Sequence, residues 1–138
     1  MGIEQLLHLV ELYLNSRSRV LLALESRGYR RAELQRVLQV HPNVLDRRQR
    51  NPALWRPGEL RQLADELGTS AWGIMGIRIL AAQLFLLPES FRRQLYKETQ
   101  LNKTKLDTRY NDYDTWQYEE VWRLACTLRR WRDVNARY

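Results

Sequence analysis

The chain has few residues of the kinds that build redox, disulfide or metal chemistry. Its 138 residues include one cysteine, Cys126, and two histidines, His8 and His41. A single cysteine excludes an intrachain disulfide, and no Cys/His or His/carboxylate spacing matches a metal site. Cys126 has no histidine near it in sequence, which favours a packed or half-exposed thiol over a nucleophile. We therefore expect no metal and no cofactor.

Long apolar runs and a secretion signal are also absent from the sequence. No stretch reaches the roughly 18 apolar residues of a membrane-spanning helix, and the acidic start, residues 2–5, is unlike a signal peptide. No nucleophile–base pair, paired carboxylates or glycine-rich phosphate loop stands out, so there is no candidate catalytic residue. These absences predict a cytoplasmic, non-enzymatic protein that contacts no membrane.

What the chain does have is positive charge, carried almost entirely by arginine. It has 23 basic and 16 acidic side chains, a net charge of +7, and all but three of the basic residues are arginines. The excess is +3 in residues 1–73 (11 basic, 8 acidic) and +4 in residues 74–138 (12 basic, 8 acidic), so no tail carries it. Arginine suits phosphates and guanine edges, which favours a polyanionic partner. A solvated basic surface without a partner is the alternative.

The sequence contains an internal repeat. Shifted by 61 residues without gaps, residues 30–67 align with residues 91–128 in 38 pairs, of which 11 are identical. Only about 2–3 identities would arise by chance, so the chain is predicted to hold two units of one fold. The predicted segments are an N-terminal amphipathic helix (1–16), a first unit (17–73) and a second, diverged unit (74–138). The identical pairs are Arg31/Arg92, Leu34/Leu95, Gln39/Gln100, Leu45/Leu106, Asp46/Asp107, Arg48/Arg109, Trp55/Trp116, Glu59/Glu120, Leu63/Leu124, Ala64/Ala125 and Leu67/Leu128.

Hydrophobic spacing predicts an all-α fold in which the two units share a core. No segment alternates with the period of two that a half-buried strand requires. The first helix, residues 2–15, carries an apolar stripe and is expected to end at the polar run 15–18, whose side chains are good helix caps. The apolar, glycine-rich segment 68–76 is expected to be a packed connection between the units. The other expected helices cover residues 19–27, 30–38, 42–50, 57–67, 77–87, 90–99, 103–110 and 116–131.

Each unit has the layout of a helix-turn-helix: a helix, a corner of three residues and a second helix. The residues LQRVLQVHPNVLDRRQRNP, followed by ELRQLADELGTS, resemble the phage-repressor, xenobiotic-response-element (Cro-like) helix-turn-helix family. The resemblance covers residues 19–72 and, more weakly, residues 79–132, as an internal tandem duplication. The chain differs from the family at two places in each unit, where such changes would open the helix pair. Gln35 and Tyr96 replace an alanine, and Gln39 and Gln100 replace the corner glycine.

The resemblance implies a transcriptional regulator that binds double-stranded DNA, with the second helix of each unit in the major groove. Arg and Asn suit base edges, whereas Lys103 and Lys105 suit phosphates. Capping is the alternative role for His41 and Asn102, and a solvated helix face is the alternative for Arg47 and Arg50. The DNA-facing residues that the resemblance implies are His41, Asn43, Arg47 and Arg50 in the first unit and Asn102, Lys103, Thr104, Lys105 and Thr108 in the second.

Other repeated residues are expected to serve the scaffold. Arg48/Arg109 and Glu59/Glu120 recur at equivalent places and predict an ion pair between the recognition helix and the closing helix of each unit. Trp55 and Trp116 are expected to anchor core or loop, because bases in a duplex are not open to stacking. The resemblance implies that Val40/Leu101 and Leu45/Leu106 pack beneath the recognition helix. Asp46 and Asp107 are expected to form a local pair with a neighbouring arginine, and cytosine recognition is the alternative.

A non-enzymatic protein-interaction or structural module on the same duplicated fold is the alternative function. The glutamines and the tyrosine at the helix pair favour it, and so does the apolar stripe of residues 2–15. We expect this stripe to pack on the chain's own core. A homodimer or another partner that covers the stripe is the alternative.

Overall fold

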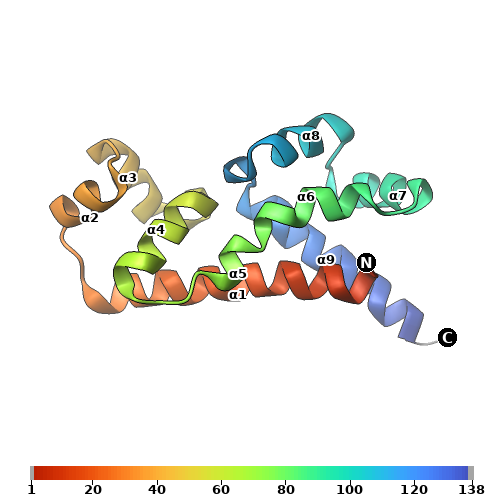
Figure 1. Cartoon of the computed structure of the whole chain (residues 1–138), viewed down its shortest axis with the longest axis horizontal. Coiled ribbons are helices and arrows are strands. Elements are labelled where there is room, and N and C mark those ends of the chain that lie inside the picture. Colours follow the sequence, from red (N-terminus) through yellow and green to blue (C-terminus); the bar gives the residue numbers. More distant parts are fainter. Residues whose placement is uncertain (1, 137–138) are drawn as a thin grey trace.

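The computed structural model describes residues 2–136, and all of the regular structure in them is helical (Figure 1). No β-strand occurs in that range, which confirms the all-α prediction. The ends of the first and last predicted segments, residue 1 and residues 137–138, lie outside the described residues. The elements are α1 (Ile3–Arg27), α2 (Arg31–Leu38), α3 (Pro42–Arg50), the 3-10 turn η1 (Pro52–Leu54), α4 (Pro57–Leu67), α5 (Trp72–Met75), α6 (Ile77–Phe85), α7 (Glu89–Thr99), α8 (Lys103–Asn111), the 3-10 turn η2 (Tyr113–Thr115) and α9 (Tyr118–Ala136).

α1 is one continuous helix, so the predicted break at residues 15–18 is wrong. Ser16 and Arg17 are 9% and 7% exposed, because other segments pack over the middle of α1. Serine and asparagine favour helix ends by bonding to the local backbone, but here burial outweighs that preference. α1 ends instead before Gly28, which adopts the left-handed conformation (φ 58°) common at helix ends.

The apolar stripe on the N-terminal half of α1 is covered by the chain itself. Leu6, Leu7, Val10 and Tyr13 are each at most 2% exposed. α5 and α9 pack against α1, and an ion pair of 2.9 Å joins Arg129 to Glu11. This confirms that the stripe packs on the chain's own core, and it leaves these side chains unavailable to a second copy.

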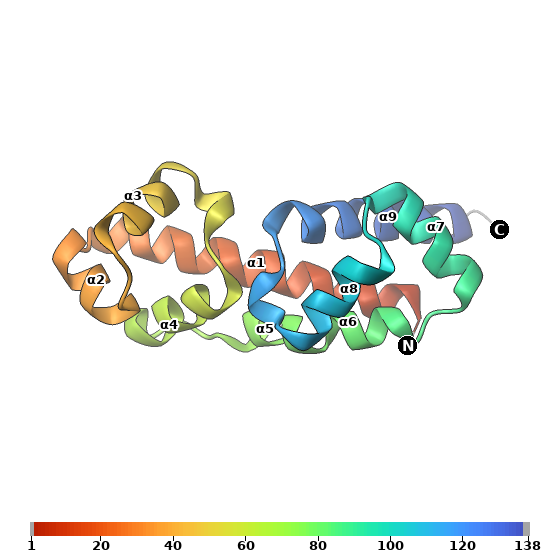
Figure 2. The same ribbon diagram turned by 90° about the horizontal axis from the view of Figure 1, so that it is seen from above.

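α1 runs beneath both units (Figures 1 and 2). α2, α3 and α4 stand over its C-terminal half, whereas α5, α6 and α9 lie along its N-terminal half. The helix therefore contributes to both units and crosses the predicted boundary between residues 16 and 17. Within residues 2–136, no helix combines the length and apolar character needed to cross a membrane.

The glycine-rich connection is packed, as predicted, and the structure shows that it packs against α1. Ile74 and Ile77 are at most 1% exposed. α5 crosses α1 so closely at Gly73 that a Cβ there would lie 2.5 Å from the carbonyl oxygen of Leu12. Trp72 differs from its neighbours, since it is 80% exposed.

The repeat in the sequence is also a repeat in the structure. α2, α3, η1 and α4 recur as α7, α8, η2 and α9 at the 61-residue spacing. At the two corners Gln39 and Gln100 both adopt the left-handed conformation, with φ of 53° and 65°. Their N–H groups donate to the carbonyls of Gln35 and Tyr96 at 2.8 and 2.9 Å. Each corner thus closes as a tight turn with glutamine in place of glycine.

Candidate nucleic-acid interface

α3 and α8 each begin at a residue whose side chain caps the helix. The Nδ1 atom of His41 accepts the N–H of Asn43 at 3.1 Å. The Oδ1 atom of Asn102 accepts the N–H of Lys105 at 2.8 Å. Both residues therefore have the capping role that was the alternative to DNA contact, although both are exposed enough to touch a ligand as well.

The predicted contact residues of α3 lie on its outer face. Asn43, Arg47 and Arg50 are exposed, whereas Leu45 on the inner face is fully buried. Neither Arg47 nor Arg50 forms an ion pair with another residue in the described part of the chain. Both guanidinium groups are therefore free to bind an anion.

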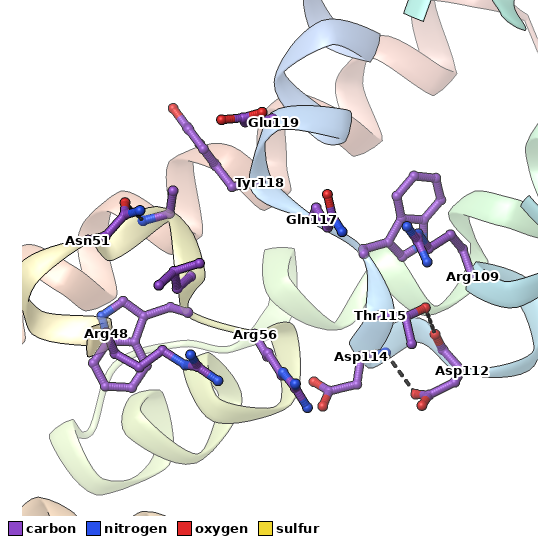
Figure 3. A pocket seen from close by; sticks show the side chains of 14 residues that line it. Arg48, Asn51, Arg56, Arg109, Asp112, Asp114, Thr115, Gln117, Tyr118 and Glu119 are labelled. Carbon is purple, nitrogen blue, oxygen red and sulfur yellow. Dashed lines mark hydrogen bonds between the residues drawn. The ribbon is translucent and has the colours of Figure 1, made fainter. Parts of the chain in front are cut away.

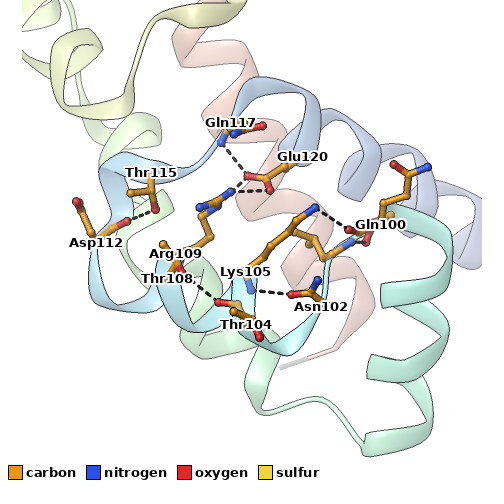
Figure 4. A network of polar contacts seen from close by, with 12 residues as sticks. Gln100, Asn102, Thr104, Lys105, Thr108, Arg109, Asp112, Thr115, Gln117 and Glu120 are labelled. Atoms are coloured by element: carbon orange, nitrogen blue, oxygen red, sulfur yellow. Dashed lines mark hydrogen bonds and ion pairs between the residues drawn. The ribbon is translucent and has the colours of Figure 1, made fainter.

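In α8 the predicted contacts are exposed too, but two of them also bond to the backbone nearby (Figure 4). The hydroxyl of Thr108 donates to the carbonyl of Thr104 at 3.1 Å. The Nζ atom of Lys105 donates to the carbonyl of Gln100 at 3.3 Å. Lys103 has no such bond among the described residues, so it is the most available cation of this helix.

The two helices that carry the predicted DNA contacts, α3 and α8, lie on the side of the molecule opposite α1 (Figure 1). Leu106, like Leu45, is fully buried beneath its helix, and Leu101 is 3% exposed, whereas Val40 is half-buried. The predicted packing beneath the helices is therefore present, with a looser fit at Val40.

The predicted arginine–glutamate pair is present in both units. The Nε atom of Arg48 donates to Glu59 Oε1 at 3.0 Å. Arg109 donates from two nitrogens to the two carboxylate oxygens of Glu120, at 2.9 Å each (Figure 4). These side chains are between 8% and 13% exposed, so solvent screens them little.

The two glutamates also bind the start of the closing helix. Glu59 accepts the N–H of Arg56 at 2.9 Å, and Glu120 accepts the N–H of Gln117 at 3.0 Å. One carboxylate in each unit therefore fixes both the arginine of α3 or α8 and the N-terminus of α4 or α9. Such a contact sets the tilt of the exposed helix relative to the core.

The repeated tryptophans serve the scaffold, but only the first of the two repeated aspartates does. Asp46 pairs with Arg31 of α2 at 2.6 Å, as predicted for a nearby arginine. Asp107 has no ion pair within residues 2–136, so the arginine pair predicted for it is wrong. Trp55 and Trp116 are each 3% exposed, which confirms their place in the packed interior.

A cleft between the two units was not predicted from the sequence. It has a volume of about 530 Å³ and is walled by equivalent loops, residues 51–56 and 112–117 (Figure 3). Asp114 reaches from the second loop to the first unit, where its Oδ1 atom accepts the N–H of Gly58 at 2.7 Å. A carboxylate from one unit thus caps α4 of the other, which couples the two units at this cleft.

Arg17 also connects the two units, and sequence reasoning missed it. Its guanidinium donates to the carbonyl of Pro52 in η1 and lies 4.2 Å from the ring centre of Tyr118 in α9. Burial lowers the pKa of Arg17, while the nearby Tyr13 acts in the opposite direction. Burial also raises the pKa of Tyr13. The available signal was an arginine four residues after Tyr13, at the spacing of the apolar stripe.

No side-chain cluster in residues 2–136 could hold a metal ion on three or more His, Cys, Asp or Glu ligands. Cys126 is exposed on α9, so of the two expected positions, packed or half-exposed, the structure excludes the packed one.

No family model, curated protein or solved structure matches the chain.

Proposed function

We propose that the protein is a DNA-binding transcriptional regulator that presents α3 and α8 to the major groove of duplex DNA. The observation that carries this proposal is the contrast between the two faces of each helix. Leu45 and Leu106 bury one face, while the other exposes Arg47, Arg50 and Lys103 without acidic partners among the described residues. The net charge of +7 supports a polyanionic partner.

The two helices differ in what they can recognise. α3 carries Asn43, Arg47 and Arg50, whose side chains can form paired hydrogen bonds with adenine and guanine edges. α8 carries Lys103 and Lys105, which act as point charges toward phosphate. In this proposal the first unit reads the sequence and the second unit fixes the position of the protein on the duplex.

Selection of bound duplexes from a random pool tests the proposal. Wild type should enrich a preferred sequence, Arg47→Ala should lose that preference, and Lys103→Ala should keep it with weaker binding. Arg19→Ala, which removes an exposed arginine of α1, is the matched control and should behave as wild type. With about 6 phosphate contacts, affinity should fall roughly a thousandfold between 50 and 200 mM salt. Failure to bind any duplex, or binding that is flat across that salt range, contradicts the proposal.

A protein-interaction module is the second candidate function. Trp72 and Leu86 favour it, because they are the two most exposed large apolar side chains of the described residues, at 80% and 72%, and offer apolar surface to a partner. A chain that enriches no duplex but self-associates, and whose self-association is lost in Trp72→Ala by sedimentation, would support this candidate and the homodimer together.

A further inference from the structure

α5 and α6 form a helical segment that is apolar on all sides. Within residues 71–87 the only polar side chains are Arg78 and Gln83. A helix that is apolar all round is normally buried all round. Here α1 and α8 cover one side, where Ile74, Ile77 and Leu84 are at most 1% exposed. Figure 2 shows α5 and α6 along one edge of the molecule, so their other side faces solvent.

That open side carries a continuous apolar stripe. Its residues recur every three or four positions, which places them on one helix face, and Gly76 between the two helices keeps helical backbone angles (φ −58°, ψ −25°). Trp72 and Leu86 are 80% and 72% exposed, and Ile79 between them is 48% exposed. We call this surface the α5–α6 stripe; it consists of Trp72, Met75, Ile79, Ala82 and Leu86.

The neighbouring helix on the same edge shows that the stripe is a local feature. α4 also buries one face, but its solvent side carries Arg61, Gln62, Asp65 and Glu66, all exposed. α4 is therefore an ordinary amphipathic helix, whereas α5 and α6 present apolar side chains to both core and solvent. An apolar patch of this kind marks an interaction surface.

Charge indicates what can cover the stripe. Each copy of the chain carries a net charge of +7, so two copies repel each other unless they meet at an uncharged face. Arg78 is the only charged residue in 71–87, and its guanidinium lies 5.8 Å from the ring centre of Tyr113 on the same chain. A polyanion would instead bind where basic side chains gather. The stripe is thus the uncharged surface that a second copy can approach.

The order of side chains along the stripe is self-complementary. Ile79 lies at the centre, and Trp72 and Leu86 lie seven residues to either side of it. In an antiparallel pair with a two-fold axis at Ile79, Trp72 of each copy faces Leu86 of the other. Ala82, the smallest side chain of the stripe, then lies beside the opposing indole and leaves room for it.

We propose that two copies of the chain form a two-fold symmetric dimer in which their α5–α6 stripes pack antiparallel, with Ile79 at the axis. The dimer supplies the partner for the interaction module named above as the second candidate function. It does not require DNA binding, because α3 and α8 are separate elements. Loss of dimerisation and loss of DNA binding are therefore distinct results.

The area of the stripe sets the expected affinity. A covered aromatic side chain buries about 150–250 Å², so Trp72, Ile79 and Leu86 together offer on the order of 400 Å² in each copy. With Met75 and the rim, the pair buries about 1,000 Å² in total, near the lower limit of specific interfaces. We expect a dimer whose dissociation constant lies in the micromolar range.

Sedimentation equilibrium between roughly 10 and 500 μM tests the dimer. Wild type should shift from the chain mass of 16.6 kDa toward twice that mass. Ile79→Glu and Ile79→Arg should each weaken association by at least roughly tenfold, because they place like charges against each other at the axis. An equimolar mixture of the two variants should associate again. Gln62→Glu, on the exposed face of α4, is the matched control and should behave as wild type.

A second set of variants tests the antiparallel arrangement. W72E and L86R should each weaken association, whereas the double variant W72E/L86R should recover it, because each glutamate then faces an arginine of the other copy. Parallel stripes would instead set like charges against each other and leave the double variant monomeric. Recovery in the mixture and in the double variant keeps both tests independent of how any single variant folds.

Vesicles of phosphatidylcholine and phosphatidylglycerol test a lipid surface as the other apolar occupant. Wild type should not bind them. A chain that stays monomeric throughout the concentration range, a mixture of Ile79 variants that fails to associate, or a monomeric W72E/L86R overturns the proposal. Vesicle binding that Ile79→Glu abolishes also overturns it, in favour of a lipid surface.

Discussion

Glu120 performs two tasks with one buried side chain. Its carboxylate accepts two hydrogen bonds from Arg109 and one from the backbone N–H of Gln117. Glu59 makes the corresponding contacts in the first unit, but with a single bond to Arg48. The second unit therefore depends more on its ion pair than the first, and substitution should reveal the difference.

Replacing Glu120 with alanine leaves the Arg109 guanidinium, 10% exposed, without its counter-charge. Breaking one partner of a buried pair costs about 3–5 kcal/mol, and we expect a loss of that size in urea unfolding followed by circular dichroism. Glu119→Ala is the matched control on the neighbouring residue. Its contact with Arg123 is 3.9 Å long and solvent-exposed, so it should change stability by less than about 1 kcal/mol.

The double substitution Arg109→Met with Glu120→Leu separates charge burial from packing. Removing both charges with side chains of similar volume is often neutral, so this variant should recover most of the stability lost in Glu120→Ala. If the double variant is as unstable as the single one, the bond from Glu120 to the N-terminus of α9 is the larger contribution.

At the scale of the helices, α5 crosses α1 at Gly73. Among the glycines of the described chain, Gly73 leaves the least space for a Cβ atom. A Cβ on Gly73 would lie 2.5 Å from the carbonyl oxygen of Leu12 and closer still to the hydroxyl of Ser16. Backbone cannot rotate away as a side chain can, so α5 must shift from α1 to accept even a methyl group.

Gly73→Ala should therefore destabilise the protein by about 1–3 kcal/mol, the usual cost of overpacking, measured as a lower midpoint in thermal unfolding. Gly2→Ala is the control, because a Cβ at Gly2 meets nothing within 4 Å. Adding Ser16→Gly to Gly73→Ala should restore the midpoint only in part, since the Leu12 carbonyl remains in place. Full recovery would show that the serine hydroxyl alone causes the strain.

Most helices could be predicted because their ends are marked by local chemistry. α3 begins at Pro42 after a capping His41, and α4 ends before a left-handed Gly68. The break predicted in α1 failed for a non-local reason. Ser16 is buried by Gly73, a residue 57 positions later, and no pattern within residues 15–18 contains that contact.

The candidate site could also be predicted only where its contacts lie within one unit. The buried arginine–glutamate pairs followed from the repeat, because identical polar residues at equivalent places imply a shared partner. The cleft and the role of Arg17 depend on how one unit sits against the other, and nothing in either unit's own sequence specifies that placement.

At the scale of the whole molecule, the two units are joined by a shared helix and by contacts of unlike kinds. Arg17 contacts η1 and Tyr118, and Asp114 caps α4 across the cleft. Because burial extends continuously through both units, separate unfolding of either one would expose α1. We therefore expect the chain to unfold as one cooperative unit.

Leu45→Ala and Leu106→Ala test this cooperativity, since the two leucines are equivalent by the repeat and both fully buried. Each substitution should cost about 2–5 kcal/mol and should move the same single transition, seen alike by circular dichroism and tryptophan fluorescence. Two transitions, each sensitive to only one of the substitutions, would show that the units fold independently despite sharing α1.

Because both units pack on α1, the two halves of this helix find their partners at different times during synthesis. The N-terminal half of α1 leaves the ribosome well before its partner α9, because the joined residues Glu11 and Arg129 are 118 positions apart. Contacts that distant in the chain close late, because the entropy of the intervening loop must be lost first. α2, α3 and α4 can assemble on the C-terminal half of α1 while Leu6, Leu7 and Val10 still lack their cover. Two halves built on one plan are thus completed at different times, and the earlier half holds an uncovered apolar helix end, open to chaperones, until the later half arrives.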